Sequence, residues 1–372
     1  MQEKVNQFMA CGLGLMLTVS SNNAMGKPID KFMAAGSELA GKEHYISADD
    51  SRLRLNGFYW RKPGEPFRRM PEDPQLPKAV NILSAHTSGG VLRFRSNTSL
   101  IKIRAKIRVR NNTADIMTYG RIGFDLYVDG IFRGISRLNF DKVNSLEYTY
   151  VSTLQQTGDG AMHDYKLYFP LYAEVLDFGI AFTPGSVFEP PAPFADERPV
   201  VLYGTSIEQG CCASRPGLSL GNQISRKLNL PVLNFGFSGS GHGESVVAEQ
   251  LANIENPCVY VLSYDANVSP ENLEKTLRPF VEILKKAHPE TPIISVSHLL
   301  CPRQNPESEW HARRTAAHQK AGTVFLNGLT VLGPDYDDCY TDTIHPNDLG
   351  MKRFADALAE KIKEFVSIPG TR

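Results

Sequence analysis

The chain has 372 residues, which suits two domains with full-sized hydrophobic cores, and its composition is ordinary for a globular protein. Its 40 lysine and arginine residues balance its 40 aspartate and glutamate residues. Nothing global therefore draws the protein to nucleic acid or to anionic lipid, and we expect small or neutral partners and no nucleic acid.

The first 24 residues predict a secretory signal peptide. Lys4 precedes the apolar run Phe8–Val19, which is too short to span a bilayer, and small polar residues follow the run. We therefore expect cleavage near residue 24 and a secreted or periplasmic protein. A buried helix or a weak anchor is the alternative. No later stretch is long and apolar enough to cross a membrane, so no stable membrane insertion is expected.

Residues 25–183 are expected to form the first domain, and from about Val80 to Phe182 the sequence pattern has a period of two. Between Leu100 and Arg110, apolar side chains alternate with basic ones, as in a strand with one buried and one solvated face. Val128-Asp129-Gly130-Ile131 predicts a hairpin turn. Short strands separated by turn signals predict an all-β sandwich domain of a jelly-roll-like kind. The other predicted strands are 91–95, 122–128, 147–152, 165–169 and 176–182.

The basic side chains of the strand 100–110 allow two interpretations. They could form a face that binds a polyanion, or a solvated strand face that discourages edge-to-edge pairing of sheets. The neutral total charge favours the solvated face. The residues concerned are Lys102, Arg104, Lys106, Arg108 and Arg110.

The pattern of apolar and polar residues changes after residue 183. Residues 184–199 are rich in proline, which excludes the interior of a sheet or helix and predicts a linker between domains. From 200 to 372, apolar runs alternate with helical stretches, which predicts a three-layer α/β/α domain with a parallel, flavodoxin-like sheet. The predicted strands are 200–203, 232–235, 259–263, 293–296 and 324–326, and the predicted helices are 218–228, 244–254, 270–287, 307–321 and 346–366.

Polar residues follow these strands at the edge of the sheet where such domains carry out chemistry. Ser206 comes after the first strand, and Asp342 and His345 precede the last helix. A serine hydroxyl becomes a nucleophile when an imidazole takes its proton, and the imidazole needs a carboxylate to fix its tautomer. Asp342 and His345 lie three residues apart, so one loop can carry both. The pattern predicts a serine hydrolase.

The same edge offers donors for the oxyanion that forms during acyl transfer. The backbone amide of Ser206 is one donor. The run from Gly236 to Gly241 offers a second amide, because glycine lets a ligand approach the backbone closely. Asn267 can donate a third hydrogen bond from its carboxamide.

These motifs resemble those of the SGNH, or GDSL, hydrolase superfamily. Gly204-Thr205-Ser206-Ile207 is similar to the first block, with threonine where aspartate is usual, and Asn234-x-Gly236-x-Ser238-Gly239 to the second. Tyr264-Asp265-Ala266-Asn267 stands in for the third block, which is usually Gly-x-Asn-Asp, and Asp342-x-x-His345-Pro346 matches the fifth.

The resemblance implies a role for each matching residue. Ser206 would be the nucleophile, His345 the base and Asp342 its orienting carboxylate. Gly239 and Asn267 would donate to the oxyanion beside the amide of Ser206. The departures from the third block leave the third donor open.

Gly123-Phe124-Asp125-Leu126-Tyr127 looks like the Gly-x-Asp-Leu-Tyr signature of a β-sandwich that precedes one SGNH subgroup. By analogy, the resemblance implies a serine esterase that hydrolyses short-chain, chiefly acetyl, esters of carbohydrates through an acyl-enzyme. Two alternatives stay open: a non-catalytic glycan-binding protein, and a lipase or acylhydrolase acting on longer acyl chains. The oligomeric state stays open too.

No metal and no cofactor are expected. His298, His311 and His318 have no acidic ligands at matching spacing. The run Gly236–Gly243 lacks the lysine and hydroxyl ending of a phosphate-binding loop.

Five cysteines follow the predicted leader. Cys258 precedes its strand and is expected to be a free thiol. For Cys339 we hypothesise a disulfide with Cys211, Cys212 or Cys301, because all four lie at the catalytic edge. A bond between the adjacent Cys211 and Cys212 is disfavoured by ring strain. The alternative is a set of reduced, buried thiols.

Overall fold

The structure is a computed structural model that describes residues 44–109, 116–137, 146–155 and 158–366. These residues all belong to one unit of the chain, which begins at Gly36. The predicted signal peptide, residues 1–24, lies outside the described residues. So does Arg110 of the basic strand.

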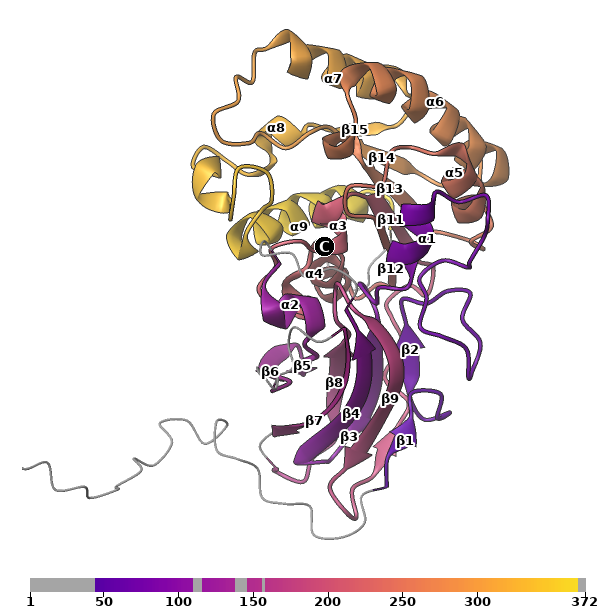
Figure 1. Cartoon of the computed structure of the whole chain (residues 1–372), viewed down its shortest axis with the longest axis vertical. Coiled ribbons are helices and arrows are strands. Elements are labelled where there is room, and N and C mark those ends of the chain that lie inside the picture. The colour runs from indigo at the N-terminus through magenta and orange to yellow at the C-terminus, as the bar shows by residue number, and fades with distance from the viewer. Residues whose placement is uncertain (1–43, 110–115, 138–145, 156–157, 367–372) are drawn as a thin grey trace, which may run out of the picture. The chain divides into compact units, whose positions relative to one another are not determined.

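Two antiparallel sheets build the first half of the described chain (Figure 1). Alternate side chains of both sheets meet in one core that includes Phe94, Ile103, Leu126 and Leu167. The β-sandwich prediction is therefore confirmed. In spatial order, the first sheet is β1 (Ile46–Ser47), β9 (Glu174–Phe182), β4 (Leu100–Arg108) and β7 (Glu147–Gln155), and the second is β10 (Phe188–Glu189), β3 (Val91–Ser96), β8 (His163–Tyr168), β5 (Asp125–Val128) and β6 (Ile131–Ile135), with β2 (Arg54–Asn56) also on β3.

The hairpin between β5 and β6 turns at Asp129 and Gly130, whose φ angles of 50° and 77° are left-handed, as a tight hairpin turn requires. The strand before it is shorter than predicted. Ile122 instead ends helix α2 (Thr118–Ile122), so β5 begins only at Asp125.

The predicted linker, residues 184–199, contributes one short strand at the edge of a sheet. Phe188 and Glu189 form β10 and pair with Ser96 and Arg95 of β3. Prolines at 190 and 191 have no amide hydrogen to donate, so the pairing cannot continue.

The basic side chains of β4 meet acidic side chains of the two neighbouring strands. Arg104 lies 3.5 Å from Asp177, Lys106 lies 3.4 Å from Glu147, and Arg108 lies 2.6 Å from Glu147. These pairs are partly exposed and add little stability each. They do neutralise the face, which agrees with a solvated strand face and argues against a polyanion site.

The second half is a parallel sheet in the order β12, β11, β13, β14, β15 (Figure 1). This is the flavodoxin-like order, in which the first strand lies between the second and the third. Every residue of β11 is buried, as expected for a strand covered on both faces. The strands are β11 (Val200–Gly204), β12 (Val232–Gly236), β13 (Val259–Ser263), β14 (Ile293–Val296) and β15 (Val324–Leu326).

Helices cover both faces of this sheet, so the three-layer prediction is confirmed. α4 (Leu220–Leu228) and α9 (Asp348–Lys363) pack in one core with Val200 and Leu202 of β11. α5 (Ser245–Ala252) and α6 (Pro270–Ala287) pack in the other core, and α7 (Glu309–Lys320) packs against α6. Among the described residues, no helix combines the length and the apolar character needed to cross a membrane.

Helix α1 (Lys78–Ser84) was not predicted, and it joins the two halves. Its residues Val80 and Leu83 belong to the same core as Phe235 of β12 and Leu251 of α5. A segment from the first half of the sequence thus completes the apolar core of the α/β half.

Candidate active site

The topological switch of the sheet lies at β11, because the chain continues from it to one neighbour and later returns to the other. β11 ends at Gly204, and helix α3 (Ser206–Gln209) follows at once. Thr205 caps this helix: its hydroxyl accepts from the amide of Ile207, and the carboxylate of Glu208 accepts from the amide of Thr205 at 2.6 Å. This reciprocal capping box gives the unusual threonine a structural role and holds Ser206 at the helix start.

The structure brings Ser206, His345 and Asp342 together. The hydroxyl of Ser206 lies 3.0 Å from Nε2 of His345, and Nδ1 of His345 lies 2.7 Å from Oδ2 of Asp342. A carboxylate against Nδ1 favours the tautomer that carries its proton there. The lone pair on Nε2 then faces the serine hydroxyl, as proton transfer from serine requires.

The loop between Tyr340 and Pro346 holds His345 and Asp342 in place. Tyr340 and Pro346 form an isolated bridge, and Oδ1 of Asp342 accepts from the amides of Ile344 and His345, both at 2.6 Å. Burial raises the pKa of Asp342, but the hydrogen bonds from the His345 side chain and from these two amides outweigh it. The net pKa lies below the ordinary value, so the carboxylate stays ionised.

Residues 236–241, here called the glycine loop, lie beside α3. A Cβ atom at Gly236 would lie 2.1 Å from the amide nitrogen of Gln209, so only glycine allows the two segments to approach this closely. Gly239 has a left-handed φ of 62° and is exposed. Its amide donates to no acceptor among the described residues, which leaves it available to a ligand.

The side chain of Asn267 reaches the same loop. Its Nδ2 lies 3.2 Å from the carbonyl oxygen of Gly241 and 3.4 Å from that of Phe237. Asn267 therefore braces the glycine loop on both sides of Gly239 in the sequence. Sequence reasoning anticipated Asn267 as a donor to the oxyanion but not this bracing contact.

Asp265 anchors the turn that carries Asn267. Its Oδ2 accepts from the amide of His298 at 2.8 Å and lies 3.1 Å from Nε2 of His318, and Arg314 forms a buried ion pair with it. Burial and the nearby Arg314 lower the pKa of His318 to about 3, so His318 is neutral. The turn thus rests on a buried ionic network.

Arg69, from the first half of the chain, was missed by sequence reasoning. Its guanidinium is fully buried and donates to the carbonyl oxygens of Asn234 and Gly236 at 2.9 and 2.8 Å, on one side. On the other side it donates to His86 and Leu83 at 2.9 and 2.7 Å. Burial lowers its pKa to about 9. No local sequence pattern signals the contacts with Asn234 and Gly236, because they cross between the two halves.

Gln209 makes a second link between the halves. Its Oε1 accepts from the amide of Ser238 in the glycine loop at 2.9 Å, and its Nε2 lies 3.1 Å from Nδ1 of His86. Tyr172 donates to the carbonyl oxygen of Ser206 at 3.3 Å. Residues of the β-sandwich half therefore support both α3 and the glycine loop.

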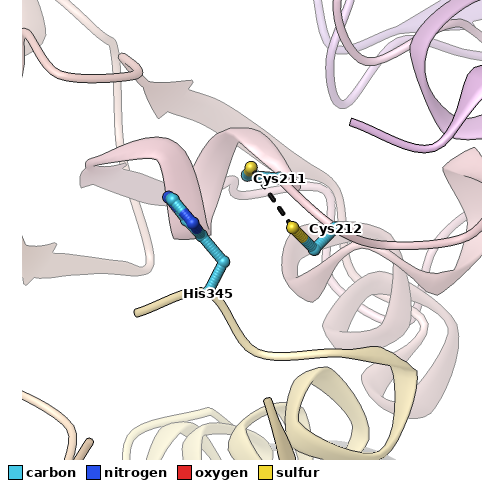
Figure 2. Close-up of side chains that lie close together, drawn as sticks. All are labelled: Cys211, Cys212 and His345. Carbon is cyan, nitrogen blue, oxygen red and sulfur yellow. Dashed lines mark hydrogen bonds between the residues drawn. The ribbon is translucent and has the colours of Figure 1, made fainter. Parts of the chain in front are cut away.

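No disulfide joins the five described cysteines, all of which are buried. The hypothesised tether through Cys339 is absent: its sulfur lies 3.4 Å from Nη1 of Arg353 on α9 and forms no disulfide. Cys258 carries a free thiol, as expected. The sulfurs of Cys211 and Cys212 face one another at 3.6 Å beside His345 (Figure 2).

Comparison with known proteins agrees with this geometry. Residues 197–363 match the GDSL-like lipase/acylhydrolase family, and residues 43–188 match the N-terminus of SGNH-hydrolase-type esterases. No curated protein sequence matches the chain significantly.

Solved structures share the fold over most of the chain. A protein from Bacteroides ovatus described as a GDSL-like lipase is 26% identical with a TM-score of 0.76, covering 87% of this chain and 98% of its own. A salicylyl-acyltransferase from a tetracycline biosynthetic pathway is 18% identical with a TM-score of 0.70, and the match covers 87% of this chain and 97% of the acyltransferase. A family two carbohydrate esterase from Cellvibrio japonicus is 12% identical with a TM-score of 0.56, covering 87% and 98%. The chain thus joins a GDSL-like lipase/acylhydrolase domain to the N-terminal domain of SGNH-type esterases, and it is a carboxylic ester hydrolase of the SGNH type.

Proposed function

We propose that this hydrolase cleaves short-chain esters, chiefly acetyl esters of carbohydrates, and that Ser206, His345 and Asp342 carry the reaction. The observation that carries the proposal is the continuous chain of contacts from the hydroxyl of Ser206 through His345 to Asp342, at 3.0 and 2.7 Å. A site with this geometry can transfer the serine proton without moving any side chain far.

In the proposed reaction, the Ser206 hydroxyl attacks the ester carbonyl while His345 takes its proton. The tetrahedral oxyanion is stabilised by the amides of Ser206 and Gly239, each such donor being worth about 3 kcal/mol. Asn267 adds a third hydrogen bond if its carboxamide turns from the loop carbonyls toward the oxyanion. His345 then protonates the leaving alcohol, and water attacks the acyl-enzyme by the reverse sequence.

One observation supports a sugar ester as the substrate. The likeness in fold to the Cellvibrio carbohydrate esterase supports a carbohydrate as the alcohol. We also propose that the protein is exported, on the pattern of residues 1–24.

Hydrolysis of a panel of acetylated sugars, compared with p-nitrophenyl esters of increasing chain length, tests the substrate. We expect the acetyl ester to have the highest kcat/KM and activity to fall with chain length. Ser206→Ala should lose about 10³-fold or more of kcat with unchanged thermal stability, because only binding and oxyanion stabilisation remain. Ser225→Ala, at a buried serine of α4 whose hydroxyl donates to the carbonyl oxygen of Leu230, is the matched control. Activity of Ser206→Ala within about tenfold of wild type would refute the serine mechanism.

A further inference from the structure

Two adjacent thiols just after α3 form a cluster with the histidine of the site. Cys211 and Cys212 are 4% and 3% exposed, and one ligand atom from each of Cys211, Cys212 and His345 lies within 4.8 Å of the other two. Figure 2 shows the two sulfurs turned toward each other beside the imidazole. The mechanism proposed above uses neither sulfur.

The spacing of the sulfurs suits a metal ion. Two thiolates that bind one tetrahedral zinc ion at about 2.3 Å each must lie about 3.8 Å apart. The sulfurs of Cys211 and Cys212 lie 3.6 Å apart. A disulfide would need about 2.05 Å, so the present geometry fits a bridging ion better than a direct bond.

This arrangement of the two sulfurs requires an unfavourable backbone conformation. Cys212 has a φ of 66°, in the left-handed region that residues other than glycine rarely adopt. Neighbouring side chains in extended backbone point to opposite sides, whereas the turn at Cys212 brings both sulfurs to one side. Backbone strain kept at a cluster of potential ligands points to a function for the cluster.

Both nitrogens of His345 already have partners in the site. Nδ1 faces Asp342 at 2.7 Å and Nε2 faces Ser206 at 3.0 Å. A metal ion bound through either nitrogen therefore removes one of the two contacts. Loss of the first disorients the imidazole, and loss of the second removes the lone pair that accepts the serine proton.

We propose that Cys211, Cys212 and His345 form an inhibitory site for a thiophilic divalent ion such as Zn²⁺. Thiolate and imidazole are the ligands that such ions prefer over Mg²⁺ or Ca²⁺. As the two metal–sulfur bonds form, both thiols release their protons to solvent, and a water molecule completes the tetrahedron. The inhibitory part of this proposal rests on the role proposed above for His345, whereas the binding part does not.

Binding is tested first, independently of activity. The full-length protein is reduced with a phosphine, freed of metal and titrated with Cd²⁺, whose thiolate complexes absorb in the ultraviolet. We expect one ion per chain and a thiolate-to-metal band. Cys211→Ala/Cys212→Ala should lose the band, and each single variant should weaken binding by at least about tenfold. Cys258→Ala removes a buried thiol far from the site along the chain and should bind as wild type does.

Inhibition is tested next, with each variant compared with its own metal-free rate on p-nitrophenyl acetate. We expect Zn²⁺ to inhibit wild type and Cys258→Ala alike, Mg²⁺ to have no effect, and a chelator to restore the rate. The double variant should need at least about tenfold more Zn²⁺ for the same inhibition. If the double variant does not fold, the single variants serve in its place.

Three outcomes overturn the proposal. No thiolate band in the reduced wild-type protein would refute the site. A band without inhibition would refute the part played by His345. Equal zinc inhibition of wild type and the cysteine variants would place the inhibitory ion elsewhere. An active Ser206→Ala variant would instead overturn the proposed function. It would not change what the cadmium titration shows about metal binding.

Discussion

Replacing Arg69 by methionine should slow ester hydrolysis while leaving ester binding nearly unchanged. The guanidinium donates to the backbone carbonyl oxygens of Asn234 in β12 and of Gly236 at the start of the glycine loop, and it lies 5.0 Å from the centre of the Phe237 ring. Methionine keeps the apolar stem of the side chain but removes every donor. The loop that carries Gly239 is then held less firmly at the point where the oxyanion forms, which affects the transition state more than the bound ester.

The structure sets the size of the effect. Arg69 donates to four carbonyl oxygens, those of His86, Leu83, Asn234 and Gly236. At about 1 kcal/mol for each buried acceptor left without a donor, their loss costs about 4 kcal/mol. Burying the charge has a cost of its own, as the lowered pKa of about 9 shows, and its removal offsets part of the loss. We expect a net destabilisation of about 2 kcal/mol.

The kinetic loss should be larger than the stability loss suggests. If the amide of Gly239 moves out of line, up to about 3 kcal/mol of oxyanion stabilisation is at risk, so kcat should fall by about 10- to 100-fold with KM within about threefold. The assay is steady-state hydrolysis of p-nitrophenyl acetate beside urea unfolding. Arg69→Lys, which keeps the charge but not the fork of donors, should be intermediate.

Arg61→Met is the matched control for the loss of a buried arginine. Arg61 pairs with Asp49 within the first half of the chain, and its contacts with Asp49 and Glu65 do not involve the glycine loop. We expect Arg61→Met to lose stability but to keep the kcat of the folded enzyme. A wild-type kcat in folded Arg69→Met, or an equal fall of kcat in the two variants, would refute the role of Arg69 as a positioning residue.

Three further predictions follow from the site. Asp342→Asn should lower kcat by about 10²- to 10⁴-fold, and a silent variant would mean that another group orients His345. Because the pKa of Asp342 is lowered in the folded state, its stabilising contribution is complete above the unfolded value of about 3.9 and is lost as the pH falls through the folded pKa. Urea unfolding should therefore show the stability gap between wild type and Asp342→Asn narrowing below about pH 4, and a gap constant with pH would contradict this. Asn267→Ala should lower kcat by about 100-fold if its carboxamide reaches the oxyanion, whereas loss of stability with kcat unchanged would leave it only the bracing role.

The elements, and the meeting of Ser206, His345 and Asp342, could be predicted because their signals are local. The alternation along Leu100–Arg108 and the unbroken apolar run of β11 each follow from which faces of one strand are buried. The strand ends at Gly204 because the next residues cap a helix, and Asp342 lies three residues before His345 in one loop. The predicted strand 122–128 began too early because a short helix ends at Ile122, and single-turn helices have no period to detect.

The support of the site was decided by tertiary packing. Arg69 meets Asn234 across 165 positions of sequence, and Gln209 meets His86 across 123. Such contacts depend on how two cores pack, which no window of neighbouring residues reports. The positions of the cysteine side chains also could not be predicted from neighbouring residues. Lying at one edge of a sheet did not give Cys339 a disulfide, and its sulfur lies beside Arg353 of α9, whereas one left-handed residue at Cys212 turned two sulfurs together beside His345.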